Sequence, residues 1–134
     1  MVPFFDLNLQ HKYIRDELLI ELKKVLEQTS FILGPQVDEF EKSFSNFVET
    51  SYGIGVNSGT SALHLALAAL DVGPGDEVIV PAMTFIATAS AVEYNGAKVV
   101  LVDVDEKTYT MDPEMLESVI TSNTKAIIPV HLYG

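Results

Sequence analysis

The motif Asn-Ser-Gly-Thr-Ser at residues 57–61 combines the residue types best suited to bind an anion in this sequence. It opens a segment rich in alanine and leucine, residues 59–70, that predicts a helix. The start of a helix offers unpaired backbone N–H groups and a partial positive charge. Gly59 would let an anion approach the backbone closely, and the hydroxyls of Thr60 and Ser61 would add donors. The motif therefore suits a phosphate group.

Two other interpretations of these residues compete with phosphate binding. The first is structural: Ser58 or Thr60 caps the helix, and Gly59 relieves a tight turn. The second is a dinucleotide-binding fingerprint, because Gly53, Gly55 and Gly59 approximate the pattern G-x-G-x-x-G. The spacing here has one residue too many, and the first two glycines flank or interrupt the expected strand instead of following it. We therefore reject the fingerprint.

An aromatic residue, Phe85, follows a strand-like segment at residues 77–80 in the sequence Pro-Ala-Met-Thr-Phe. Ligands of open α/β sheets bind outside the carboxyl ends of the strands, so this ring is expected on the ligand side of the sheet. A flat heteroaromatic cofactor would gain about 0.5–1.5 kcal/mol from offset stacking on it. An ordinary core position for Phe85 is the competing interpretation. Together, the phosphate-binding motif and the ring fit a phosphorylated planar cofactor.

The remaining polar candidates give weaker signals. The three histidines, His11, His64 and His131, match no metal-binding spacing. His64 is expected to pack within its helix, and His131 is placed either to line the crevice or to serve a structural role. Asp103 and Asp105 follow a strand and could bind a cation, although roles in turns and caps suit them better.

The apolar pattern predicts the elements that position these side chains. Helices are expected at residues 13–28, from Pro35 to about residue 48, and at 59–70, 84–94 and 113–120; strands are expected at 54–56, 77–80, 98–102 and 125–130. The strands are apolar throughout, which is typical of a parallel sheet covered on both faces. The sequence thus predicts an α/β fold, a mostly parallel sheet with helices on both faces.

Composition and charge exclude several classes of protein. Among the 134 residues, 48% are hydrophobic and 20% are charged, which is the balance of a folded globular chain. With 19 acidic and 8 basic residues, the net charge of −11 argues against binding to nucleic acid or to an anionic membrane. The sequence has no cysteine and no apolar stretch long enough to span a bilayer, and residues 1–6 lack the basic and apolar pattern of a signal peptide. We therefore expect a cytoplasmic protein.

Several sequence blocks in a fixed order resemble the DegT/StrS family of sugar aminotransferases, enzymes of fold type I that use pyridoxal 5′-phosphate. The blocks lie at residues 3–7, 31–35, 37–41, 55–65, 73–81, 84–88, 102–104 and 128–134. No single block is specific for the family, but the occurrence of all of them in this order along nearly the whole chain is specific for it. The resemblance implies that Gly59, Thr60 and Ser61 hold the phosphate of the cofactor and that Phe85 stacks on its pyridine ring.

The resemblance also implies a reaction and partners. Members transfer an amino group, commonly from glutamate, to a keto-sugar carried on a nucleotide, and they are typically homodimers. Residues 1–34 would form an N-terminal helical segment, and residues 35–134 the first, incomplete part of the large cofactor-binding domain. Three alternatives remain. The first is a sugar dehydratase of the same family, the second a non-catalytic regulatory protein on the same scaffold, and the third a nicotinamide-dependent reductase.

The resemblance does not extend to the catalytic lysine. In the family this lysine forms the Schiff base with the cofactor, and an aspartate pairs with the pyridine nitrogen. Both belong to parts of the family pattern beyond residue 134, and no lysine of this chain stands in the family's lysine context. We therefore expect the 134 residues alone to contain no catalytic residue and to be inactive.

Overall fold

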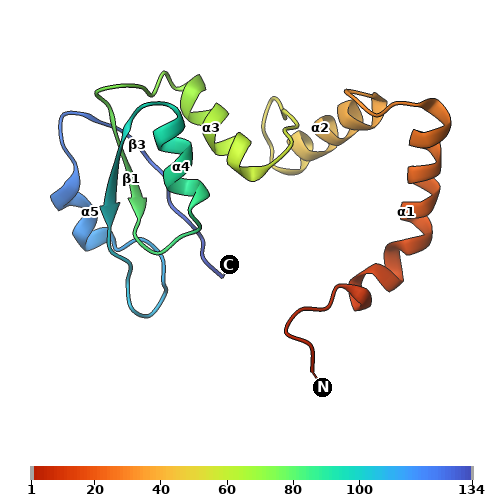
Figure 1. Ribbon diagram of the computed structural model, residues 1–134, viewed down its shortest axis with the longest axis horizontal. Coiled ribbons are helices and arrows are strands. Elements are labelled where there is room, and N and C mark those ends of the chain that lie inside the picture. The colour runs from red at the N-terminus through yellow and green to blue at the C-terminus, as the bar shows by residue number, and fades with distance from the viewer. Residues whose placement is uncertain (1, 134) are drawn as a thin grey trace. The chain divides into compact units, whose positions relative to one another are not determined.

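The computed structural model describes residues 2–133 of the chain. Backbone contacts divide the chain into two units, residues 1–55 and residues 56–134. The first unit is helical, and the second holds a sheet with helices around it (Figure 1). Within residues 2–133, the structure contains no helix that is both long and apolar enough to cross a membrane.

The first unit consists of helices α1 (Asn8–Gln28) and α2 (Pro35–Phe47), both of which the sequence predicts. α1 begins earlier than expected, because Oδ1 of Asp6 accepts hydrogen bonds from the backbone and side-chain nitrogens of Asn8 at 2.8 and 2.7 Å. These bonds fix the chain where it enters the helix. α2 begins at Pro35 as predicted, since proline in the first turn lacks only an N–H that would have no helical partner.

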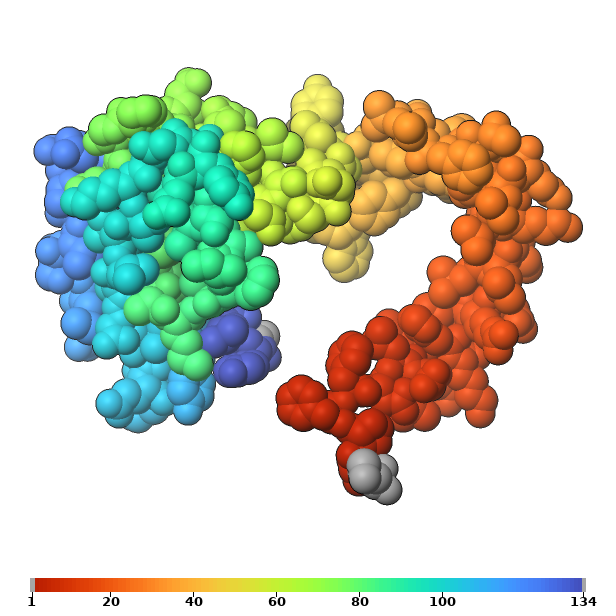
Figure 2. Space-filling view, in the orientation of Figure 1, coloured from red at the N-terminus to blue at the C-terminus, as the bar shows by residue number. Residues whose placement is uncertain are grey.

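The apolar side chains of the first unit are largely exposed. α1 contains no buried residue, and Leu18, Leu22 and Leu26, which recur at helical spacing, are each more than half exposed. Figure 2 shows the side chains of α1 at the surface along the red-to-orange segment. On α2, the rings of Phe40 and Phe44 contact each other with centroids 5.6 Å apart and are both at least half exposed. Apolar surface of this extent is typical of an interaction site.

The predicted strand at residues 54–56 is wrong for the described part of the chain, where these residues form no strand. The backbone bonds to α2 instead: the N–H of Gly55 donates to Oε1 of Glu41 at 2.6 Å. A Cβ atom at Gly53 would come within 2.7 Å of the Glu41 carbonyl oxygen, so glycine permits this close approach. The short apolar pattern suits a strand, but a strand also needs a neighbouring strand to pair its backbone groups. Within residues 2–133, no strand lies beside this segment.

The second unit contains a parallel sheet of three strands. Its elements are α3 (Gly59–Ala69), β1 (Glu77–Pro81), α4 (Ala87–Tyr94), β2 (Lys98–Val102), α5 (Pro113–Val119) and β3 (Thr124–Ile127). The strand order is β2-β1-β3, with β1 parallel to both neighbours. The predicted α/β class with a parallel sheet is therefore confirmed.

Two element boundaries in this unit differ from the prediction. The helix expected from Thr84 begins at Ala87, because the residues after β1 first form a loop. The strand expected to reach residue 130 ends at Ile127. Pro129 has no N–H to donate, so it cannot continue the ladder of hydrogen bonds. The loop after β1 carries Phe85, one of the candidate site residues.

Val78 and Val80 of β1 form the centre of the hydrophobic core, and both are fully buried. They cluster with Leu67 of α3 and with Ala91 and Val92 of α4. All five residues of β1 are buried, which requires cover on both faces of the central strand because successive side chains alternate between faces. α4 packs against β1 and β2, and α5 packs against β2. This packing fixes the carboxyl end of β1, from which the loop with Phe85 departs.

Glu77 links the three strands at their amino ends. The residue is only 7% exposed. Its Oε1 accepts a hydrogen bond from Nζ of Lys98 on β2 at 2.8 Å, and its Oε2 accepts one from the hydroxyl of Thr121, ahead of β3, at 2.6 Å. Lys98 first, and Thr121 second, hold the pKa of Glu77 below its ordinary value. The carboxylate therefore stabilises the sheet at the end opposite to the loop with Phe85.

Candidate functional site

α3 begins with Ser58 as its N-cap residue. The backbone of Ser58 is extended, and its Oγ accepts a hydrogen bond from the backbone N–H of Ser61 at 3.1 Å. The Ser58 hydroxyl also donates to the Ser61 hydroxyl at 3.0 Å. The structural interpretation of Ser58 as a helix cap is therefore confirmed. This cap satisfies one of the amides that a helix start leaves unpaired.

Gly59 and Thr60 keep their backbone N–H groups available. In the described part of the chain, neither N–H donates a hydrogen bond. Gly59 is exposed, and a Cβ atom built on it would meet no other atom within 4 Å. A Cα–Cβ bond tilts toward the N-terminus of a helix, so this open space lies in front of the unpaired amides.

The start of α3 therefore fits a phosphate. Two unpaired amides, one of them on a glycine with open space in front of it, lie at the positive end of an 11-residue helix. The hydroxyl of Thr60 stands on the same first turn and is only half-buried. The capping by Ser58 and the binding of an anion are compatible, because the cap uses the amide of Ser61 and leaves those of Gly59 and Thr60.

Phe85 lies in the loop between β1 and α4, and 75% of the residue is exposed. An ordinary core position for this ring is therefore wrong for the described chain. The loop leaves the carboxyl end of the central strand, which is where ligands of parallel α/β sheets bind. An exposed aromatic face at this edge can receive a planar ligand.

Thr84 and Thr88 flank Phe85 and were not singled out by the sequence pattern. Their hydroxyl oxygens lie 2.9 Å apart, in hydrogen-bonding contact. The backbone N–H of Thr88 donates to the carbonyl oxygen of Phe85 at 3.1 Å. Thr88 is 5% exposed and sits in the first turn of α4. The i, i+4 spacing of the two threonines was the signal in the sequence that could have revealed this contact.

α3 packs against α4, the helix that follows Phe85. The ring of His64 on α3 meets the ring of Tyr94 on α4 edge-on, with centroids 5.8 Å apart. The side-chain amide of Asn95 donates to the carbonyl oxygens of His64 and Ala91, at 3.2 and 2.8 Å. The expected packing role of His64 is therefore confirmed. Both candidate segments, the start of α3 and the loop before α4, belong to helices that pack together in one unit.

Asp103 and Asp105 serve the loop that follows β2. Oδ1 of Asp105 accepts hydrogen bonds from the backbone N–H groups of Thr108 and Lys107, at 2.8 and 3.0 Å. The bond from Thr108, followed by that from Lys107, lowers the pKa of the Asp105 carboxyl. Oδ1 of Asp103 accepts from the N–H of Val104 at 2.8 Å. The preferred interpretation of both residues as turn formers is confirmed. Separately, residues 2–133 contain no group of three or more potential ligands arranged to hold a metal ion.

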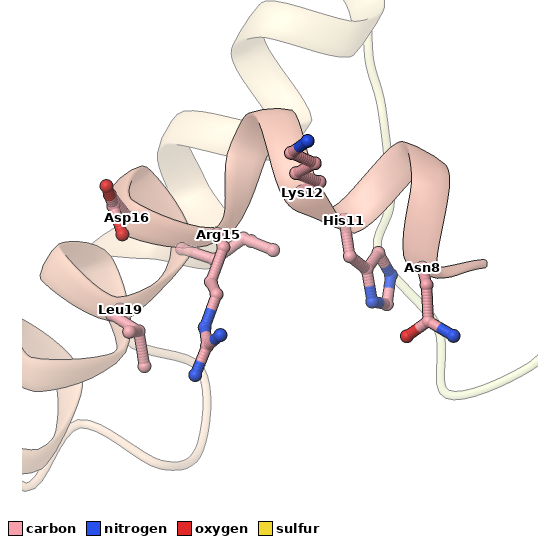
Figure 3. A pocket seen from close by; sticks show the side chains of 7 residues that line it. Asn8, His11, Lys12, Arg15, Asp16 and Leu19 are labelled. Atoms are coloured by element: carbon pink, nitrogen blue, oxygen red, sulfur yellow. The ribbon is translucent and has the colours of Figure 1, made fainter.

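A shallow hollow lined mostly by polar residues lies on α1, and His11 is part of it. Figure 3 shows Asn8, His11 and Arg15 directed to one side of the helix, with Lys12 and Asp16 on the other. All residues that line it belong to α1, and each of them is exposed. A single exposed helix cannot enclose a ligand. His131, the remaining histidine, is exposed beyond the end of β3.

Comparison with known proteins identifies a family for this chain. Residues 12–134 match the DegT/DnrJ/EryC1/StrS aminotransferase family. The chain is 52% identical over 133 residues to a UDP-N-acetyl-3-dehydro-α-D-glucosamine 3-aminotransferase from Acidithiobacillus ferrooxidans, covering 99% of this chain and 36% of the relative. The resemblance to DegT/StrS enzymes in the sequence is thus confirmed.

Solved structures agree with the sequence match. DesV of Streptomyces venezuelae, solved in complex with a ketimine intermediate, superposes with a TM-score of 0.94 at 46% identity, over 99% of this chain and 36% of that one. NtdA of Bacillus subtilis, solved with bound cofactor PMP, gives a TM-score of 0.90 at 40% identity, over 99% and 31%. The chain therefore spans about a third of the length of the relatives that it matches.

Proposed function

Because this chain belongs to the DegT/DnrJ/EryC1/StrS aminotransferase family, we propose that it forms the phosphate-binding part of a sugar aminotransferase that uses pyridoxal 5′-phosphate. The family depends on this cofactor, and solved relatives carry PLP or PMP. The observation that carries the proposal is the open start of α3. There the N–H groups of Gly59 and Thr60 have no partner in the described chain, and a Cβ atom at Gly59 would meet only open space.

The residues of this chain would hold the cofactor by its two ends. The amides of Gly59 and Thr60 and the hydroxyls of Thr60 and Ser61 would bind the phosphate, and charge-assisted bonds of this kind are the stronger class. The exposed ring of Phe85 would support one face of the pyridine ring. When bound, the cofactor acts as an electron sink for the carbon that bears the amino group. Holding both ends fixes the plane of the ring, and Phe85 keeps water from that face.

The proposed substrate is a keto-sugar linked to a nucleotide, with glutamate as the amino donor. The relative from A. ferrooxidans is named for an aminotransferase reaction on a UDP-linked 3-keto-sugar, which supports this class. We further propose that the enzyme is a homodimer in the cytoplasm, without nucleic-acid or membrane partners. The exposed apolar residues of α1 support contact with a second subunit. The net charge of −11 disfavours binding to nucleic acids and to anionic membranes.

The test is an assay of both half-reactions with the protein that carries this chain. The protein is loaded with pyridoxal phosphate, the spectrum is followed on addition of glutamate, and 2-oxoglutarate is measured. A UDP-linked 3-keto-sugar is then added, and the amino sugar is detected by mass spectrometry. The proposal expects one 2-oxoglutarate for each amino sugar. A spectrum that glutamate leaves unchanged, with no amino sugar formed, would contradict it.

The same assay separates the alternatives. A sugar dehydratase would bind the cofactor and convert a sugar substrate without consuming glutamate. A non-catalytic regulatory protein would form no amino sugar and would not turn yellow with the cofactor. We also propose that the 134 residues by themselves do not transaminate, since none of their lysines matches the family's catalytic lysine. Turnover by the 134-residue chain would refute that statement.

A further inference from the structure

Within residues 2–133, Phe85 has little packing of its own. The residue is 75% exposed, so few neighbours restrict its ring. It also lies outside regular structure, four residues after the end of β1 at Pro81 and two residues before the start of α4 at Ala87. A loop residue with this exposure is ordinarily mobile. A ring that is to receive a planar ligand in one orientation therefore needs a backbone fixed by other residues.

Thr88 supplies two contacts that fix this backbone. Its N–H donates to the carbonyl oxygen of Phe85 at 3.1 Å, which holds the peptide that follows the ring. Its hydroxyl bonds to the hydroxyl of Thr84 at 2.9 Å, which holds the residue before the ring. Thr88 itself is 5% exposed in the first turn of α4, and the adjacent α4 residues Ala91 and Val92 are fully buried in the core. The two bonds thus connect both sides of Phe85 to the rigid part of the unit.

We propose that Thr88, with Thr84, is a positioning residue that presents the exposed ring of Phe85 to a planar heteroaromatic ligand. The identity of that ligand rests on the proposed function. The statement that Thr88 and Thr84 fix the loop does not depend on it. A pre-organised ring binds more tightly because less conformational entropy is lost when the ligand arrives. Neither threonine needs to touch the ligand. Both act through Phe85.

The experiment compares variants that remove or retain the hydroxyl pair. Thr84→Val and Thr88→Val remove one hydroxyl each at nearly constant volume, and Thr88→Ser retains the hydroxyl. Thr110→Val is the matched control, because Thr108 and Thr110 also have hydroxyl oxygens 2.9 Å apart, in an exposed loop of the same unit. Each variant is measured for hydrogen exchange at the Thr88 N–H, for the χ1 distribution of Phe85 by NMR couplings, and for pyridoxal phosphate affinity by absorbance titration.

We expect Thr84→Val and Thr88→Val to raise exchange at the Thr88 N–H about fivefold, the effect of one lost hydrogen bond, and to broaden the χ1 distribution of Phe85. Cofactor affinity should fall by a similar factor in both. Thr88→Ser and Thr110→Val should stay within twofold of the unaltered protein. Unchanged exchange and χ1 distribution in both valine variants would overturn the proposal.

The two proposals fail in distinguishable ways. If the unaltered protein binds no pyridoxal phosphate, the proposed function is contradicted, while exchange and χ1 still decide whether Thr88 fixes the loop. If the cofactor binds and the valine variants loosen Phe85 without weakening binding, the ring does not serve as a platform and the positioning role is refuted. An effect of Thr110→Val equal to that of Thr88→Val would also refute it, because the response would then be a general loss of stability.

Discussion

Replacing Gly59 with alanine separates folding from binding at the start of α3. Gly59 does not have a left-handed backbone, and a Cβ atom there would meet nothing within 4 Å. The protein should therefore accept the methyl group. Alanine restricts the unfolded chain more than glycine does, so the free energy of unfolding should stay level or rise by up to about 1 kcal/mol.

The same methyl group should weaken cofactor binding. The Cα–Cβ bond tilts toward the N-terminus of the helix, which places the methyl group where the phosphate would meet the amides of Gly59 and Thr60. Loss of one charge-assisted hydrogen bond costs about 1.5–3 kcal/mol, so the Kd for pyridoxal phosphate should rise about tenfold to a hundredfold.

The assay pairs thermal unfolding, followed by circular dichroism, with an absorbance titration of the cofactor. Gly73→Ala is the matched control, because its added Cβ would have only the carbonyl oxygen of Asn95 within 4 Å, at 3.9 Å, and its backbone is not left-handed either. The control should bind the cofactor normally. An unchanged Kd in Gly59→Ala would refute the phosphate site, and a strongly destabilised Gly59→Ala protein would refute the open space in front of α3.

Three further predictions concern single side chains. Phe85→Leu should change the free energy of unfolding by less than about 0.5 kcal/mol, because the ring is exposed. The same change should raise the Kd for pyridoxal phosphate about two- to tenfold, because stacking on the ring is lost. An unaltered Kd in the titration would contradict the role of the ring. Ser58→Ala should lower the free energy of unfolding by about 1 kcal/mol through loss of the cap, measured by urea denaturation, and an equal stability would show that the cap contributes nothing. Glu77→Gln should lower the melting temperature at neutral pH. The pKa of Glu77 is lower in the folded protein than in the unfolded protein, so the stability that Glu77 contributes is complete above the unfolded pKa and is lost as the pH falls through the folded pKa. The difference in melting temperature between the variant and the unaltered protein should therefore vanish in strong acid. A difference independent of pH would contradict the ion pair with Lys98.

The sequence predicts the elements of the second unit well because local signals agree there with long-range packing. Asp112 and Pro113 mark the start of α5, and Oδ1 of Asp112 does accept the N–H of Glu114, at 2.9 Å. The continuous apolar run around Val78 and Val80 predicts a strand buried on both faces, and β1 is the central strand. Each of these features is decided by neighbours in the sequence or by burial alone.

Where prediction failed, partners distant in the sequence decide the outcome. The apolar residues 54–56 suit a strand, but the backbone of Gly55 bonds to Glu41 on α2, a contact that no local pattern reveals. The candidate site was predicted only in part for a different reason, an error in a helix boundary. The residue types at 59–61 indicate anion binding. The hydrogen bond from Thr88 to the carbonyl oxygen of Phe85 depends instead on where α4 begins, and the sequence pattern predicted that start at Thr84 and not at Ala87. Helix boundaries are less certain than helix existence.

The measurement that tests the central claim most directly is a crystal structure of the protein with pyridoxal phosphate bound. The account predicts phosphate oxygens within hydrogen-bond distance, about 2.7–3.2 Å, of the amides of Gly59 and Thr60, with the ring of Phe85 stacked on the pyridine. A phosphate bound elsewhere, with the start of α3 facing solvent or another protein segment, would contradict it.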